Sequence, residues 1–247
     1  MGYLMNILLS NDDGVKSPGL RLLAKRLSKN HNVIIVAPND NRSGASTSLT
    51  VRKPVTIKEE FFNDDIKTYS TTGSPADCVK MAHHLIKDFK IDLVVSGINN
   101  GYNIGTDIYY SGTMGAAFQG AILGYKSIAF SISYNSNFLT EYIDLAINII
   151  EKISCQSHIV WNVNFPAVSP LEIKGIKYTS VGDVLYSDYY EQCGDNSYQL
   201  KGELLYNPNC KNDCDVNLIR DGYVTITPVS MDRTDHFVLN NNIIWKK

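Results

Sequence analysis

Short apolar runs alternate with amphipathic stretches through the first two-thirds of the chain. Each run is long enough for one buried strand, and the runs occupy 6–10, 33–37, 93–96, 128–132 and 159–163. Strands that alternate with helices are typical of βαβ units and a parallel sheet. The pattern therefore predicts an α/β protein with a three-layer, Rossmann-like, mostly parallel sheet. We expect 159–163 to be the last strand of this main sheet.

Helix starts are marked by residues that cap a first turn. Ser17–Pro18 and Ser74–Pro75 each combine a capping hydroxyl with a proline suited to the first helical position. The predicted helices begin at Ser17, run from Ser74 to about Lys87, cover Thr113–Leu123 and begin at Thr140. Two shorter strands are predicted at 55–58 and 67–71, with 61–65 as part of the connection between them.

The pattern changes after Pro166. Strand-like segments, many tyrosines and a polar loop with cysteines follow, without further βαβ units. We expect residues 1–170 to form the Rossmann-like core. Residues 171–247 are expected to form a C-terminal extension with a β-hairpin, a returning strand at 223–227 and a tail. Exposed strand-rich arms often pair with another subunit, which predicts a homodimer or homotetramer that uses the hairpin for oligomerisation.

Composition excludes several classes of partner. A net charge of -2 gives no electrostatic basis for binding a nucleic-acid duplex or an anionic membrane, and no apolar run reaches the length of a membrane span. The N-terminal residues lack the pattern of a secretory signal, and five irregularly spaced cysteines fit a reducing cytoplasm. Cys210 and Cys214 have no second pair of zinc ligands nearby, so we expect ordinary thiols. His31 and His158 precede strands and are expected to be exposed.

Two adjacent carboxylates follow the first predicted strand. Asp12 and Asp13 would lie at its carboxyl end, where open α/β sheets bind ligands. Adjacent acids repel each other, and a hard divalent cation with a preference for oxygen ligands would neutralise them. The alternative is a solvated turn in which Gly14 supplies a positive φ.

Three further polar segments are predicted at the same edge of the sheet, at 37–46, 96–101 and 110–113. Together with the acidic pair they predict a polar cleft, the usual position of an active site. Ser111, Gly112 and Thr113 stand at a helix start, where free N–H groups and the helix dipole can bind phosphate. A plain helix cap is the alternative. Arg42 is either a charged partner for an anion or a member of a surface salt bridge.

The order and spacing of these motifs resemble the SurE family of stationary-phase survival proteins, which are metal-dependent nucleoside monophosphate phosphatases. The motifs that carry the resemblance are Asn11–Gly14, Asn41–Ser46, Ser96–Asn99 and Tyr110–Thr113. The resemblance extends from Asn6 to the C-terminal arm. It implies that one divalent cation per subunit is bound by Asp12, Asp13, Ser43 and Asn99.

The resemblance also implies roles for other residues. Asp12, Asp13 and Asn99 would be the catalytic residues. The substrate would be bound by Asn11, Arg42, Ser43, Gly44, Ser111, Gly112 and Thr113. Asp232 and His236 match a family pair that supports the site or subunit packing.

The implied ligands are hard oxygen donors, which favour Mg²⁺ or Mn²⁺ over zinc. The expected reaction is metal-dependent hydrolysis of nucleoside 5′-monophosphates, and of 3′-monophosphates, to nucleoside and phosphate. A non-catalytic, metal-dependent nucleotide sensor is the alternative from another class. A dinucleotide-binding dehydrogenase is disfavoured because G-x-G-x-x-G does not follow the first strand, and an ATPase because G-x-x-x-x-G-K-[ST] is absent.

Overall fold

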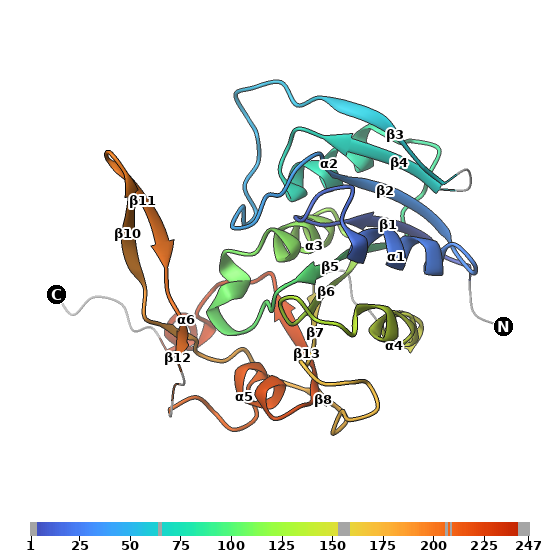
Figure 1. Ribbon diagram of the computed structural model, residues 1–247. Helices are drawn as coiled ribbons and strands as arrows, with labels where there is room; N and C mark the ends of the chain where they lie inside the picture. The colour runs from blue at the N-terminus through green and yellow to red at the C-terminus, as the bar shows by residue number, and fades with distance from the viewer. Residues whose placement is uncertain (1–3, 64–65, 153–158, 206, 208, 242–247) are drawn as a thin grey trace.

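A nine-stranded sheet with helices on both faces forms the centre of the molecule (Figure 1). The computed structural model describes residues 4–63, 66–152, 159–205, 207 and 209–241. In spatial order, the strands are β3 (Ile57–Asn63), β4 (Ile66–Thr71), β2 (Asn32–Pro38), β1 (Asn6–Ser10), β5 (Leu93–Asn100), β6 (Lys126–Ile132), β7 (Ile159–Phe165), β13 (Val224–Ser230) and β8 (Ile176–Tyr178). The strands from β4 to β7 are all parallel, which confirms the predicted fold class.

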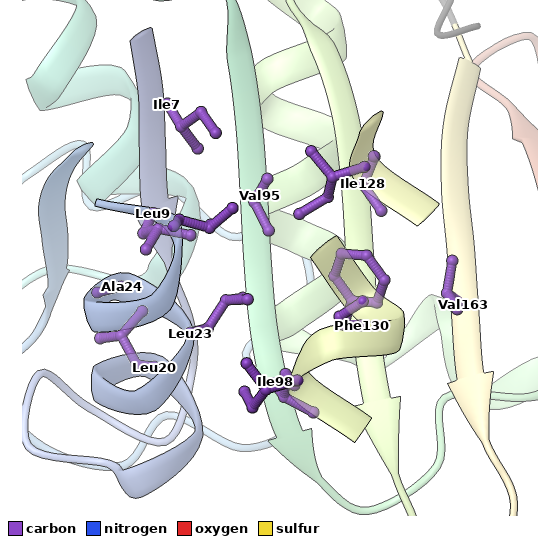
Figure 2. Packing of buried hydrophobic residues seen from close by; sticks show 14 of the residues in the cluster. Ile7, Leu9, Leu20, Leu23, Ala24, Val95, Ile98, Ile128, Phe130 and Val163 are labelled. Atoms are coloured by element: carbon purple, nitrogen blue, oxygen red, sulfur yellow. The ribbon is translucent and has the colours of Figure 1, made fainter. Parts of the chain in front are cut away.

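The helices divide between the two faces of the sheet. On one face, α1 (Pro18–Leu27) and α4 (Leu139–Lys152) bury apolar side chains against the strands. Figure 2 shows Leu20 and Leu23 of α1 beside Leu9, Val95 and neighbouring strand residues. On the other face, α2 (Pro75–Leu85) and α3 (Gly112–Ile122) pack against the alternate strand positions.

The predicted helix caps are present for two helices. The hydroxyl of Ser17 accepts a hydrogen bond from the Leu20 N–H. Ser74 forms a reciprocal capping box with Asp77. In contrast, α4 begins at Leu139, so Thr140 lies inside the helix rather than at its cap.

Three expectations about the sheet are wrong. The first strand of the outer pair is Ile57–Asn63 rather than 55–58, so part of the predicted connection is strand. Polar residues hid the continuation of β5 through Asn100. The sheet also does not end at β7, because β13 pairs with it in antiparallel orientation and β8 then pairs with β13. The strand predicted at 223–227 therefore belongs to the main sheet.

One helical crossover has the opposite hand to the others. The chain moves one strand in the same direction from β5 to β6 and from β6 to β7, but α3 and α4 lie on opposite faces. Compared with β5–α3–β6, the β1–α1–β2 connection runs in the opposite direction across the sheet and has its helix on the opposite face. The two connections therefore have the same hand. Parallel crossovers are right-handed in about 98% of cases, which makes β6–α4–β7 the exception. As a result α4 lies beside α1, and Arg26 pairs with Asp144 at 2.7 Å.

The C-terminal extension carries the remaining elements. A hairpin of β10 (Tyr189–Gly194) and β11 (Ser197–Lys201) projects away from the sheet (Figure 1). The smaller elements are β9 (Leu185–Tyr186), β12 (Leu204–Leu205), α5 (Asp215–Arg220) and α6 (His236–Asn240). None of the helices in the described ranges has both the length and the apolar character needed to cross a membrane.

The two histidines that were expected to be exposed have different outcomes. His31 is 6% exposed. It lies just before β2, and its Nδ1 accepts a hydrogen bond from the Met5 N–H, just before β1, at 3.4 Å. The prediction for His31 is therefore wrong. His158 lies outside the described residues, as does the end of the predicted tail, residues 242–247.

Candidate metal and phosphate site

The turn after β1 holds the acidic pair in a fixed position. The Asn11 side-chain amide donates to the Gly14 carbonyl at 3.0 Å and to the Ser17 hydroxyl at 2.7 Å. Gly14 has a φ of +96°, a conformation that favours glycine. Asn11 therefore ties the turn to the start of α1, while Asp12 and Asp13 extend from the carboxyl edge of the sheet as predicted.

Asp12 lies against the beginning of α3. Its Oδ1 accepts a hydrogen bond from the Thr113 hydroxyl, and the Asp12 side chain is almost completely buried. Gly112 makes this approach possible, since a Cβ there would lie 2.7 Å from the Asp12 Cβ and 3.1 Å from the Arg42 carbonyl oxygen. The hydroxyl of Ser111 caps the helix by accepting the Met114 N–H at 3.0 Å. The helix start and the carboxylate thus form one unit.

Asp13 contacts two other segments at this edge. Its Oδ2 accepts the backbone N–H of Asn100 at 3.2 Å, and its Oδ1 lies 3.5 Å from the side-chain nitrogen of Asn41. Asn99 precedes this contact, and its side-chain nitrogen donates to the Gly101 carbonyl at 2.9 Å. That contact leaves the Asn99 carbonyl oxygen as the free end of the amide.

The loop after β2 closes over the pair. The Arg42 N–H donates to the Asp12 carbonyl at 2.7 Å, and the Ser43 N–H donates to the Asn41 side-chain oxygen at 2.9 Å. Ser43 is exposed, and Gly44 follows it with a φ of +76°. The Arg42 guanidinium donates a hydrogen bond to the Thr72 carbonyl, a neutral group, at 3.0 Å.

The same loop is fastened to the segment before α3. The Ser46 hydroxyl donates to the Tyr109 carbonyl at 2.6 Å, and its backbone N–H donates to the Tyr110 carbonyl at 3.0 Å. Every segment predicted at the cleft therefore lies at one edge of the sheet. Sequence reasoning missed the roles of Asn41 and Asn100 as partners of Asp13, because a single amide residue in a polar loop gives no periodic signal.

The electrostatics of the pair favour neutralisation. Burial raises the pKa of Asp12 to about 6, against the opposing effect of the Thr113 hydrogen bond, and the Asp13 charge adds to the rise. Burial also raises the pKa of Asp13, opposed by the Asn100 N–H. Both carboxyl groups thus hold a proton more readily than a solvated carboxyl group does, and a divalent cation would stabilise their charged forms instead.

The donor set fits a hard cation. The four residues expected to bind a cation would supply two carboxylates (Asp12 and Asp13), a hydroxyl (Ser43) and a carbonyl oxygen (Asn99), all of which suit Mg²⁺ or Mn²⁺. In the part of the chain that the structure describes, no group of three or more His, Cys, Asp or Glu residues is placed to hold a metal ion. A site of nitrogen and sulfur ligands, as zinc prefers, is therefore not formed among those residues.

Two other predicted features lie in the extension. His236 Nε2 is 2.6 Å from Asp232 Oδ2, and both side chains are exposed. Cys210 and Cys214 are buried as free thiols beside Gly182, where a Cβ would lie 2.9 Å from each sulfur.

Fold and site together define a class: Rossmann-like α/β proteins with an acidic pair beside a helix N-terminus at the carboxyl edge of the sheet. The family model described as survival protein SurE matches residues 7–188. A 5′-nucleotidase SurE from Clostridium botulinum (strain Alaska E43 / Type E3) is 41% identical over 96% of this chain and 97% of its own length. One from Petrotoga mobilis is 39% identical over 98% and 99%.

A solved structure gives the same result. The crystal structure of the SurE protein from Aquifex aeolicus is 36% identical to this chain, with a TM-score of 0.80, and covers 95% of this chain and 97% of its own. The chain belongs to the SurE family.

Proposed function

We infer that this chain is a 5′-nucleotidase, a phosphomonoesterase that releases phosphate from nucleoside 5′-monophosphates. Its relatives named 5′-nucleotidase SurE cover nearly the whole chain and support this activity. The observation that carries the inference is the buried Asp12 carboxylate, hydrogen-bonded to Thr113 at the first turn of α3. The buried carboxylate, which a cation would stabilise, therefore lies next to a helix end that attracts phosphate.

The proposed cofactor is one Mg²⁺ or Mn²⁺ per subunit, held by Asp12, Asp13, Ser43 and Asn99. The raised carboxyl pKa values and the uniform oxygen chemistry of these residues support it. When bound, such an ion would polarise the phosphoryl group and lower the pKa of a coordinated water.

The phosphate is proposed to bind at the start of α3, beside Asp12. The Ser111 hydroxyl is used by the helix cap and the Thr113 hydroxyl by Asp12. The helix would therefore act on phosphate mainly through its N–H groups and its dipole. Gly112 permits close approach, and Asn11, Arg42, Ser43 and Gly44 complete the proposed substrate-binding set. One acid of the Asp12 and Asp13 pair would accept the proton of the attacking water.

The test is phosphate release from nucleoside 5′- and 3′-monophosphates, with Mg²⁺, with Mn²⁺ and after chelation. We expect Asp12→Asn and Asp13→Asn each to lose at least about 10²-fold in kcat, as removal of a key electrostatic group does. Asp40→Asn is the matched control, since Asp40 is an exposed acid near the same edge. Full activity in metal-free Asp12→Asn protein would contradict the proposed chemistry.

The same assay tests the alternative of a non-catalytic nucleotide sensor. A sensor would bind nucleotide and metal without multiple turnover.

We further propose that residues 1–170 carry the catalytic core. Residues 171–247 are proposed to serve assembly, while they also contribute β13 and β8 to the sheet. The protein is proposed to work in the cytoplasm as a homodimer or homotetramer. The exposed β10–β11 hairpin supports assembly.

A further inference from the structure

Two thiols of the C-terminal extension lie close together, outside the residues assigned to the proposed active site. Cys210 is 8% exposed and Cys214 is completely buried. A Cβ at Gly182 would lie 2.9 Å from the sulfur of each, so both sulfurs occupy the space that a side chain at this position would fill. Burial raises the pKa of Cys214 to about 11, and the neighbouring Cys210 thiol adds to the rise. The two thiols are therefore neighbours in the folded protein.

A turn between the two cysteines brings them together. The Cys214 N–H donates to the Lys211 carbonyl at 3.2 Å, and the side-chain amide of Asn217 in α5 donates to the same carbonyl at 3.0 Å. The loop is thus folded back and fastened to α5. A disulfide needs its two Cα atoms no more than about 7 Å apart, and a turn with both sulfurs beside Gly182 favours that approach.

The second cysteine of the pair lies at a junction of the extension. Cys214 is the N-cap residue of α5. On either side of it, the Asp213 carbonyl accepts the Ser180 N–H at 3.4 Å, and the Asp215 N–H donates to the Ser180 carbonyl at 2.9 Å. The Asp215 carboxylate in turn accepts the Gly105 N–H at 2.9 Å. A bond at Cys214 would therefore restrain the residue that links the extension to the segment before α3.

We propose that Cys210 and Cys214 form a reversible disulfide, which makes the pair a site of redox modification. The oxidant is a low-molecular-weight disulfide. Cys210, the more accessible thiol, attacks one sulfur of this reagent and forms a mixed disulfide, while one reagent thiol leaves. Cys214 then attacks the Cys210 sulfur and releases the second reagent thiol. The pair loses two electrons and two protons, and the oxidant takes up both to become two thiols.

Oxidised glutathione, added to the full chain, tests the proposal directly. Trypsin cleaves after Lys211, between the two cysteines, so a disulfide joins peptides 202–211 and 212–220. After free thiols are alkylated and monomers are isolated on a denaturing, non-reducing gel, we expect the joined peptides in the monomer band and their separation by dithiothreitol. The exposed Cys193 reports that the oxidant has acted. Glutathione on Cys193, with peptides 202–211 and 212–220 never joined, would overturn the proposal.

Single substitutions test the order of attack. Cys214→Ser should keep glutathione on Cys210, because no second thiol displaces it. In Cys210→Ser, the buried Cys214 should take up glutathione at least about tenfold more slowly than Cys193. Equal rates at Cys214 and Cys193 would overturn the assigned order. Cys193→Ser is the matched control and should form the joined peptides as the wild type does. The wild-type experiment needs no substitution, so it decides the main proposal even if a variant does not fold.

Brief trypsin treatment of the native protein measures the restraint that the disulfide imposes. Lys211 is exposed inside the closed loop, and Lys174 is exposed outside it. We expect oxidation to slow cleavage at Lys211 by at least about tenfold, because cleavage requires local opening of the loop. Cleavage at Lys174 should be unchanged. Equal cleavage at Lys211 in the oxidised and reduced proteins would contradict the proposed restraint on the start of α5.

Discussion

The carboxyl edge of the sheet and the C-terminal hairpin differ in how far their side chains are buried. At the sheet edge, Asp12 is 3% exposed and its surroundings are fixed by hydrogen bonds from Thr113 and Arg42. In the β10–β11 hairpin, every strand residue before Lys201 is exposed, including Tyr190 at 69%. The contacts that hold Asp12 at the sheet edge therefore come from the same chain. A two-stranded hairpin, in contrast, is only marginally stable by itself and needs further contacts.

A buried carboxylate connects the C-terminal extension to the segment before α3. Asp215 of α5 accepts the Gly105 N–H at 2.9 Å from the loop before α3, and the Gly182 N–H at 2.8 Å from the extension. Burial raises the pKa of Asp215, and these N–H groups oppose the rise.

The largest effect is expected for glycine at the site edge. In Gly112→Ala, the new methyl group would approach the Asp12 side chain and the Arg42 carbonyl, so the helix start or the carboxylate must move. Displacement by about 1 Å can cost about 10²-fold in rate, and we expect a loss of that size in kcat/KM for nucleotide. Overpacking should also cost about 1–3 kcal/mol in the free energy of unfolding.

Gly194→Ala in the hairpin is the matched control. Its nearest neighbour to a new Cβ is the Ser197 Cβ at 3.6 Å, an ordinary contact. Activity and unfolding free energy should therefore stay close to those of the wild type. Equal losses in both variants would show that the two regions do not differ as described.

The link between the regions should have an intermediate effect. Asp215→Asn replaces one acceptor oxygen by an N–H donor opposite backbone N–H groups, which should lower the free energy of unfolding by about 1–3 kcal/mol. Urea unfolding would measure this, with Asp213→Asn as the control because Asp213 is exposed. No difference between the two variants would contradict the assigned role of Asp215.

The sequence predicts the buried part of this molecule better than its edges. The runs that form β1, β2, β5 and β6 are apolar and short, so their hydrophobic pattern and their length were sufficient to predict strands. The edge strand β3 contains Glu59 and Glu60, and an edge strand can carry charges without a burial pattern. The hand of the β6–α4–β7 crossover has no local signal in the sequence.

The candidate site shows the same limit. Asp12 and Asp13 were found because two acids directly follow a buried run. Asn103 was missed, although its backbone carbonyl accepts hydrogen bonds from the side chains of Asn162 and Asn164 and so fixes the loop before α3. Alternating asparagines in an apolar strand were the available signal, but their partner is distant in sequence and only the tertiary fold identifies it.

The smallest effect is expected from pH and separates two histidines. Burial lowers the pKa of His31, opposed by Glu151, and its Nε2 has no hydrogen-bond partner among the residues that the structure describes. The unfolded chain, with a histidine pKa of about 6.5, therefore takes up the proton more readily than the folded chain. Stability from His31 is complete above that pH and is lost as the pH falls through it. Urea unfolding at a series of pH values should show this loss in wild-type protein and in His236→Gln, since the exposed His236 pair with Asp232 contributes little. His31→Gln should have a flatter profile, and an unchanged slope in that variant would show that His31 is not responsible.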